Sequence, residues 1–181
     1  MIYVQTMKQI DSIRLLQNIA IAANEATSVE EALQICLDEI CALIKWPVGH
    51  VYLHSDDALD EMVSSRIWHL DDPEEFTSFK KVTEITSFAI GEGLPGRVYA
   101  SGEPAWISDV TQDRNYPRAE LAKNIEVKSG FAFPVKVDGK VAAVLEFYSP
   151  KAVSPDKDLL DITTHYGFSA GRYLLVIVIK G

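Results

Sequence analysis

The feature that most constrains this fold is a pair of apolar runs joined by the dipeptide Asp138-Gly139. Residues 130–137 and 140–149 are rich in valine, alanine and phenylalanine, and only the dipeptide separates them. Asp-Gly in this position favours a two-residue turn whose twist matches that of antiparallel strands. We therefore expect a β-hairpin, and with it an antiparallel sheet, at the centre of the fold.

The other expected elements are arranged around this hairpin. Alternating apolar residues predict strands at 49–54, 62–70, 88–92 and 104–110. Three- and four-residue periodicity and capping signals predict helices at 4–24, 29–45, 73–85, 117–125 and 156–173, with a short helix that ends near Gly102. This order indicates an α+β fold, in which the terminal helices pack on one face of a central antiparallel sheet.

Length and charge limit the class of protein. The chain has 181 residues, which is the size of one domain, and its formal net charge is -9. Lys80-Lys81 is its largest basic cluster, so we expect no nucleic-acid partner and no attachment to an anionic membrane. The longest apolar run, residues 173–179, is too short to span a bilayer. With a polar, amphipathic N-terminus, the chain is expected to be cytoplasmic, with no direct membrane insertion.

The sequence contains no recognisable catalytic or metal-binding motif. Cys36 and Cys41 lie five residues apart on a predicted helix and point in different directions, so they cannot share a metal ion or a disulfide. The four histidines are scattered, and neither a G-x-S-x-G nor an H-E-x-x-H pattern is present. We therefore predict no catalytic residue and no metal ligand.

Several segments together resemble GAF domains, which are small-molecule-sensing and dimerisation modules. The run Gly91–Val98 (GEGLPGRV) is similar to a characteristic turn of that family. Gly102–Val110, Val144–Phe147 and Ser154–Ile162 are similar to the elements that follow it. The resemblance covers residues 10–172 and is greatest to modules of bacterial sensor histidine kinases. It implies a PAS-related fold with a pocket on the sheet face away from the terminal helices, under loops and short helices.

The resemblance implies a set of residues that line or border this pocket. They are Trp68, Phe88, Trp106, Asp109, Phe131, Phe133, Glu146 and Tyr148. The aromatic residues are equally consistent with an ordinary core. Glu146 is more informative, because it interrupts the apolar run 141–148 and a buried carboxylate must be paired, hydrated or facing a ligand. Arg97, Arg118 and Asp109 are possible polar neighbours of Glu146. All four residues are also consistent with positions on a solvated surface.

No cofactor is predicted, and the expected ligand is an unidentified small molecule. Covalent bilin attachment requires a pocket cysteine, but no cysteine follows Cys41. The cyclic-nucleotide type of GAF domain has asparagine and phenylalanine near the positions of Ser149 and Val153, which argues against that ligand. Haem bound through His54 or His69 remains an alternative.

These features suggest three parts: an amphipathic signalling and dimer helix at 1–24, a GAF domain at 25–172, and an atypical tail at 173–181. An apolar stripe on the first helix predicts a homodimer formed through the N- and C-terminal helices. The expected function is a non-catalytic, small-molecule-sensing domain of a bacterial signal-transduction protein, specifically a two-component sensor histidine kinase. The alternatives are a structural dimerisation module whose pocket is filled by its own side chains, and a haem or redox sensor.

Overall fold

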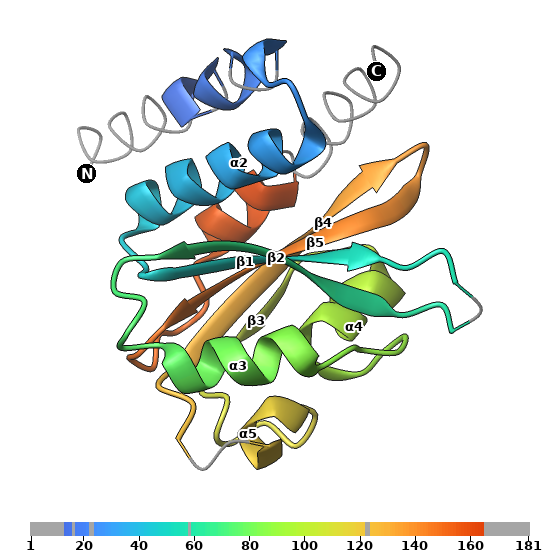
Figure 1. Ribbon diagram of the computed structural model, residues 1–181. Helices are drawn as coiled ribbons and strands as arrows, with labels where there is room; N and C mark the ends of the chain where they lie inside the picture. Colours follow the sequence, from blue (N-terminus) through green and yellow to red (C-terminus); the bar gives the residue numbers. More distant parts are fainter. Residues whose placement is uncertain (1–12, 16, 22–23, 58, 122–123, 165–181) are drawn as a thin grey trace.

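A five-stranded antiparallel sheet forms the middle layer of the molecule (Figure 1). The computed structural model describes residues 13–15, 17–21, 24–57, 59–121 and 124–164. The strands are β1 (Val48–His54), β2 (Met62–Leu70), β3 (Ala105–Ile107), β4 (Ser129–Val137) and β5 (Lys140–Ser149). They are arranged in the order β2-β1-β5-β4-β3, so that β5 is the central strand. The predicted α+β class with an antiparallel sheet is confirmed.

The hairpin that the sequence predicts joins β4 and β5. Val137 pairs with Lys140, and both turn residues adopt positive φ, 52° at Asp138 and 77° at Gly139. These values are those of the turn that suits the right-handed twist of two antiparallel strands. Beyond the turn, the register shifts by one residue between Val135 and Lys136, and this shift brings Ala132 on β4 opposite Glu146 on β5.

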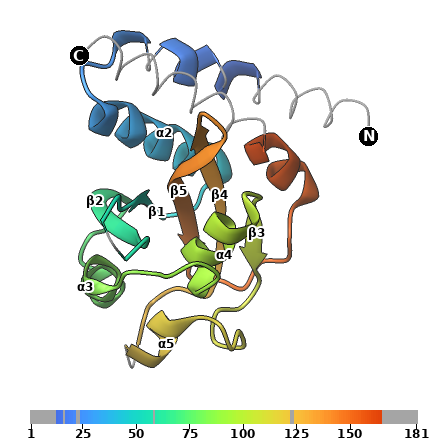
Figure 2. The same ribbon diagram turned by 90° about the vertical axis from the view of Figure 1, so that its right-hand side faces the viewer.

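Helices cover both faces of the sheet. On one face, called the α2 side, lies α2 (Val29–Ile44), with helical residues between 13 and 25 and at 157–164 beside it (Figures 1 and 2). On the opposite face, called the α3 side, lie α3 (Thr77–Ile85), α4 (Gly93–Ser101) and α5 (Pro117–Leu121). Each face has its own buried hydrophobic cluster. The sheet thus separates two cores, as a three-layer α+β domain requires.

Helix α2 begins where the sequence indicates. The Ser28 hydroxyl accepts a hydrogen bond from the backbone N–H of Glu31 at 3.1 Å, which is the arrangement of an N-cap. The helix packs closely on β1, because Gly49 has no side chain. A Cβ at Gly49 would lie 3.0 Å from Sγ of Cys41 and 3.3 Å from the ring of Phe147. The glycine therefore permits direct contact between helix and strand.

Several predicted elements are shorter in the structure. Helix α3 begins at Thr77 rather than 73, because the preceding residues form turns that the Asp72 carboxylate caps. The predicted strand at 88–92 is reduced to one bridge between Met62 and Phe88. Gly91, at φ 83°, turns the chain away there, and its N–H donates to the carbonyl of Gly96 instead of to a neighbouring strand.

The remaining segments differ at their ends. The predicted strand at 104–110 is β3, Ala105–Ile107, and the helix predicted at 117–125 is helical at Pro117–Leu121. The C-terminal helix begins at 157. The predicted tail at 173–181, and the parts of the terminal helices at 1–12 and 165–173, lie outside the described residues. Within the described residues, no helix has the length and apolar character needed to cross a membrane.

Candidate functional site

Glu146 is a fully buried carboxylate in the middle of the sheet. It lies on central strand β5, opposite His50 on β1 and Ala132 on β4. Side chains alternate between the two faces of a strand. Val144 and Tyr148 accordingly belong to the hydrophobic cluster of the α3 side, and Glu146 projects into the same side. A charge in this position requires a partner, because an isolated buried carboxylate is very costly.

Arg118 on α5 is that partner. Its Nη1 donates to Oε1 of Glu146 at 2.9 Å, and its Nη2 donates to Oε2 at 2.8 Å. Nη1 also donates to the Thr83 hydroxyl at 3.2 Å, and Nη2 to the hydroxyl of Tyr148. The whole arginine side chain is buried. This two-point geometry is the strongest form of the arginine–carboxylate interaction.

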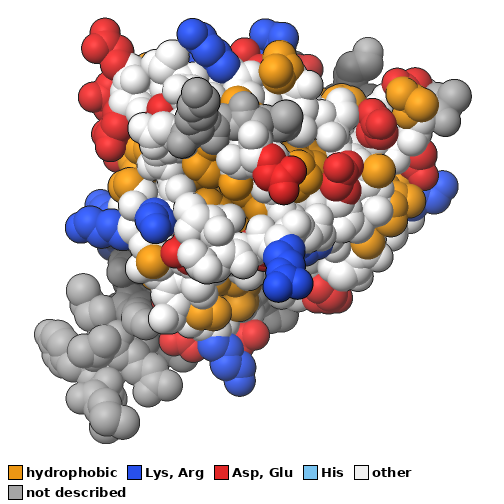
Figure 3. Space-filling view, turned by 90° about the horizontal axis from the view of Figure 1, so that it is seen from below, with side chains coloured by type: hydrophobic (Ala, Val, Ile, Leu, Met, Phe, Trp, Pro, Cys, Tyr) orange, Lys and Arg blue, Asp and Glu red, His pale blue; other side chains and the backbone are white. Residues whose placement is uncertain are grey.

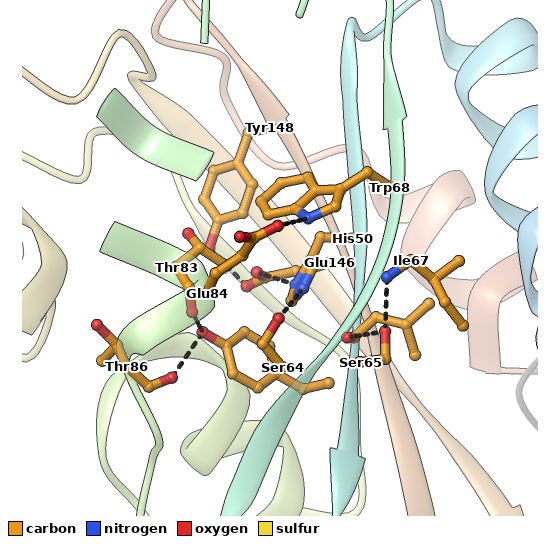
Figure 4. A network of polar contacts seen from close by, with 12 residues as sticks. His50, Ser64, Ser65, Ile67, Trp68, Thr83, Glu84, Thr86, Glu146 and Tyr148 are labelled. Atoms are coloured by element: carbon orange, nitrogen blue, oxygen red, sulfur yellow. Dashed lines mark hydrogen bonds and ion pairs between the residues drawn. The ribbon is translucent and has the colours of Figure 1, made fainter. Parts of the chain in front are cut away.

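His50 completes the polar cluster from the β1 side (Figure 4). Its Nδ1 lies 3.1 Å from Oε1 of Glu146, and its Nε2 lies 2.9 Å from the Ser64 hydroxyl. The Glu146 carboxylate only accepts hydrogen bonds, so we assign the imidazole proton to Nδ1 and the accepting role to Nε2. Tyr148 also donates its hydroxyl to Oε2 of Glu146, at 2.8 Å.

A bulge in β2 brings Ser64 to His50. The register moves from His50 opposite Trp68 to Tyr52 opposite Ser64, so β2 has two more residues than β1 between these pairs. The Ser65 hydroxyl donates to the carbonyl of Val51 and accepts from the N–H of Ile67, which stabilises the bulged segment (Figure 4). Bulges of this kind redirect side chains and are frequent beside functional sites.

The charges within the cluster balance. Burial by itself would raise the pKa of Glu146, but the Arg118 charge and the hydrogen bonds from His50 and Arg118 lower it to about 2. Burial also lowers the pKa of His50, and the contact with Glu146 offsets this only in part. Burial by itself would lower the pKa of Arg118, but Glu146 and the surrounding tyrosines together outweigh burial and raise this pKa well above its usual value. At neutral pH the cluster therefore contains one negative group, one positive group and a neutral histidine.

Five aromatic rings surround the guanidinium group of Arg118. The distances from Cζ to the ring centroids lie between 5.0 and 5.8 Å. We call this set of rings the aromatic cage; its members are Tyr52, Phe79, Phe88, Tyr116 and Tyr148. Aromatic faces attract a cation at such distances. Within the part of the chain that the structure describes, Nε of Arg118 has no hydrogen-bond partner.

Trp68 lies at the edge of the cluster. Its ring centroid is 4.2 Å from that of His50, and its indole N–H donates to the Glu84 carboxylate at 3.1 Å (Figure 4). Tyr52 connects the cage to α3, since its hydroxyl donates to the carbonyls of Thr83 and Thr86, both at 3.0 Å. On the outer face of the α3 side, acidic and basic side chains are interspersed (Figure 3).

The structure places four of the eight predicted site residues together. Glu146 and Tyr148 belong to the polar cluster, Phe88 belongs to the cage, and Trp68 borders both. The other four lie elsewhere. Asp109 is at the surface, where it accepts from Thr111 and lies 3.6 Å from Nζ of Lys128.

The predicted position of Trp106, Phe131 and Phe133 needs correction. All three pack in the cluster of the α2 side, where the rings of Trp106 and Phe131 stack at 5.3 Å. The cross-strand register explains this. Ala132 lies opposite Glu146, so the neighbouring residues Phe131 and Phe133 point to the other face of the sheet.

Sequence reasoning named Arg118 only as a possible neighbour of Glu146 and did not select His50, Tyr52, Phe79 or Tyr116. The alternation of His50 and Tyr52 with Val51 was a usable signal, because it puts the two polar residues on one face of β1. Arg97, the other arginine considered, instead makes two hydrogen bonds to Asp113, at 3.0 and 2.6 Å.

The two histidines considered as haem ligands, His54 and His69, both contact carboxylates. His69 has both ring nitrogens within 2.9 Å of carboxylates, those of Asp38 and Asp71, and His54 Nε2 lies 2.6 Å from Asp60. Among the described residues, no cluster of three or more histidine, cysteine, aspartate or glutamate side chains is arranged to hold a metal ion. Cys36 and Cys41 are buried on α2, across the sheet from Glu146.

A surface groove lies on the α2 side, away from the Glu146 cluster. It runs between α2 and the helical residues that precede it, and its lining residues are Asn18, Ile21, Glu25, Ala26, Glu31, Ile35 and Glu39. The Asn18 amide donates to the Glu39 carboxylate at 3.0 Å across this groove. The groove combines surface carboxylates with aliphatic side chains and lacks the converging buried groups of the Glu146 cluster.

Comparison with known proteins places these features in a family. A family model described as "GAF domain" matches residues 26–174. Among curated proteins, the Arabidopsis thaliana transcription factor GLABRA 3 is 32% identical over 75 residues. That match covers 40% of this chain but only 11% of the transcription factor, so it concerns a small part of a much longer protein.

Solved structures match over almost the whole chain. The GAF domain of a phosphoenolpyruvate-protein phosphotransferase from Coxiella burnetii is 16% identical, with a TM-score of 0.75 and coverage of 95% of this chain and 97% of that one. The free methionine-R-sulfoxide reductase of Neisseria meningitidis, solved in complex with its substrate, is also 16% identical, with a TM-score of 0.75 and coverage of 94% and 92%. At this level of identity, the two likenesses concern the fold alone.

Proposed function

The chain belongs to the GAF domain family, and on this premise we propose that it is a non-catalytic regulatory domain that binds a small molecule at the Glu146 cluster. The observation that carries the proposal is the complete burial of Glu146, Arg118 and His50 on the α3 side of the sheet. Replacing a buried ion pair by apolar residues is often neutral or stabilising, so stability alone does not account for this cluster. Polar groups that converge among aromatic rings are typical of ligand sites.

We propose a non-catalytic role for this domain even though the structurally similar Neisseria protein is a reductase. The only two cysteines of the chain, Cys36 and Cys41, lie on α2, across the sheet from the cluster. Burial raises the pKa of Cys36 to about 12, and burial also raises that of Cys41. Reactive cysteines are thiolates in exposed, electropositive surroundings, and these two thiols have neither property.

We further propose that ligand state reaches the rest of the protein through a homodimer formed by the N- and C-terminal helices. In the described part of the first helix, Ile13 and Ile21 lie on one side of the helix and each is 56% exposed. A second copy of the chain would cover them. The sequence resemblance to modules of bacterial two-component sensor histidine kinases supports a cytoplasmic signalling protein of that class as the setting.

Native mass spectrometry of the protein as purified from cells tests the proposal. We expect a dimer that carries an additional small mass, and we expect Glu146→Gln to lose that mass. Ile13→Asp combined with Ile21→Asp should shift the dimer to monomer. The control is Ile85→Asp, which changes an exposed isoleucine on α3, on the other side of the sheet. A bare monomer in the unmodified protein would contradict both the sensing and the dimer proposal.

A second candidate function is a structural dimerisation module. One observation favours it, namely that Arg118 already fills the aromatic cage with a side chain of the protein itself. In that case the same spectrum would show a dimer without additional mass, and Glu146→Gln would lower stability without any effect on ligand binding.

A further inference from the structure

We propose that the aromatic cage is a binding site for a small alkylguanidinium compound, which binds by displacing the Arg118 side chain from Glu146. The inference rests on the proposed function, because it names the ligand class of the same site. In the described structure, Arg118 then acts as a tethered occupant that keeps the site closed.

The shape and polarity of the cage fit a planar cation. The guanidinium carbon lies within 5.0–5.8 Å of five ring centroids, contributed by β1, β5, α3 and the segments before α4 and α5. One or two such contacts are ordinary in proteins, whereas a complete set of rings resembles the cages that bind organic cations. The cage would therefore retain its attraction for a cation after Arg118 has left.

The hydrogen-bond acceptors select a guanidinium rather than an ammonium group. Four acceptors lie around the two terminal nitrogens of Arg118: the two oxygens of Glu146, the Thr83 hydroxyl and the Tyr148 hydroxyl. Two planar NH2 groups provide four N–H donors, one for each acceptor. A primary ammonium has only three donors and lacks the flat, forked geometry that matches a carboxylate at two points.

The Arg118 side chain itself fits the aromatic cage imperfectly. Nε of Arg118 is buried without a hydrogen-bond partner among the described residues, and such an unsatisfied donor weakens the bound arrangement. The backbone of α5 fixes where the Arg118 side chain enters the cage. A free ligand is not tethered to α5 and is not restricted in this way.

Charge balance also favours this exchange. Arg118 and Glu146 are both fully buried, with opposite charges in direct contact. A monocation that replaces Arg118 leaves the net charge of the buried cluster unchanged, whereas a neutral or anionic ligand would leave Glu146 without a counter-charge. The displaced arginine can move to water, because α5 lies at the periphery of the molecule, farther from the sheet than α3 (Figures 1 and 2).

The tethered occupant sets the affinity of the site. A group held in place by its own chain competes at a high effective concentration, commonly in the millimolar range. The apparent affinity of a ligand equals its intrinsic affinity multiplied by the fraction of molecules in which the site is free. Removal of Arg118 should therefore strengthen binding, which is the opposite of the effect expected for a residue that contacts the ligand directly.

The test compares five proteins: the unmodified chain, Arg118→Met, Glu146→Gln, the double variant and Arg97→Met. Methionine removes the charge and the hydrogen-bond donors of Arg118, and its flexible side chain can leave the cage when a ligand enters. The probe is methylguanidinium chloride at low millimolar concentration, with methylammonium chloride as the comparison. Binding is measured by calorimetry and by tryptophan fluorescence, to which Trp68 beside the cluster contributes. Arg97→Met is the matched control, because it removes an arginine–carboxylate pair outside the cage.

We expect Arg118→Met to bind methylguanidinium at least tenfold more tightly than the unmodified chain and the Arg97→Met control do. Arg118→Met should also bind methylguanidinium at least tenfold more tightly than methylammonium. Binding should be lost in the double variant. Equal affinity of Arg118→Met and the unmodified chain, equal affinity for the two probes, or binding that survives in the double variant would each overturn the proposal. Should Arg118→Met fail to fold, Arg118→Lys, a weaker occupant, must still bind methylguanidinium more tightly than the unmodified chain.

The outcomes also separate this inference from the proposed function. Binding of the probe with no change in the proportion of dimer or in hydrogen exchange of α2 would support the ligand class and contradict the proposed relay. A retained cellular ligand without a guanidinium group, together with no binding of the probe, would support the sensing function and overturn this inference.

Discussion

The most direct prediction from the structure concerns the stability of the Glu146→Gln variant. Glutamine keeps the shape of the side chain but removes the charge that pairs with Arg118 at 2.8 and 2.9 Å. Arg118 then remains buried as a cation without its counter-ion. We expect the free energy of unfolding at pH 7 to fall by about 3 kcal/mol, a large part of the stability of a typical domain.

The magnitude follows from the pKa of Glu146. The interactions with Arg118 and His50 lower it from 4.5 to about 2. The difference corresponds to about 3 kcal/mol in favour of the folded state at neutral pH. Removing one partner of a buried ion pair costs about 3–5 kcal/mol in other proteins, which agrees. For a chain of this length, the loss corresponds to a decrease in Tm of roughly 6–12 °C.

The pH dependence gives the prediction a second, independent readout. Because the pKa is lower in the folded state, the contribution of Glu146 is complete above the unfolded value of 4.5. It is lost as the pH falls from 4.5 toward 2. The difference in unfolding free energy between the unmodified protein and Glu146→Gln should therefore be constant from pH 7 to about 5 and then shrink.

Urea unfolding followed by circular dichroism at pH 7, 5.5, 4 and 3 measures this difference. The matched control is Glu103→Gln, which changes an exposed glutamate and should alter stability by less than about 0.5 kcal/mol. A cost below about 1 kcal/mol for Glu146→Gln at pH 7 would refute the reasoning. So would a difference that stays the same at pH 3.

Three further predictions concern other parts of the molecule. The pKa of His69 is raised, because hydrogen bonds to two flanking carboxylates outweigh the effect of its partial burial. The stabilisation from protonated His69 is therefore complete below pH 6.5 and is lost as the pH rises through the pKa of the folded state. His69→Gln should remove this pH dependence of the unfolding free energy, measured by urea unfolding between pH 5.5 and 8.5. Gly96→Ala should cost about 1–3 kcal/mol in thermal unfolding, because its Cβ would lie 2.3 Å from the carbonyl oxygen of Ala89, and unchanged stability would contradict the tight turn. Cys36 and Cys41 should react with a thiol reagent only after unfolding, and labelling of the native protein within minutes would show that α2 opens readily.

Much of the fold could be predicted because local signals and tertiary structure agree. The Asp138-Gly139 turn, the Ser28 cap and the second predicted strand, Met62–Leu70, all occur as the sequence indicates. Short elements between glycines were less predictable. The segment around Gly91 was expected to be a strand, but its backbone turns back on itself and forms a single bridge at Phe88. Such segments depend on neighbours that local sequence does not reveal.

The site could be predicted only in part, and for a clear reason. Glu146 was recognisable because a carboxylate in an apolar strand needs an explanation. Its partner Arg118 lies 28 residues away on a short helix, and no periodicity connects the two. The aromatic residues were ambiguous in another way: Phe131 and Phe133 carry the same chemistry as Phe88, and only the cross-strand register shows which face each one joins.

The close contact at Gly49 has a mechanical consequence. His50, the next residue along β1, contacts Glu146 on one face of the sheet, while Gly49 lies against Cys41 of α2 on the other. There is no compressible layer of side chains between strand and helix at this position, and packed protein interiors yield little. A displacement of β1 at His50 is therefore expected to move α2 by a similar amount. Alanine at position 49 would push β1 and α2 apart, and movements on the two faces of the sheet would then be less closely coupled than glycine allows.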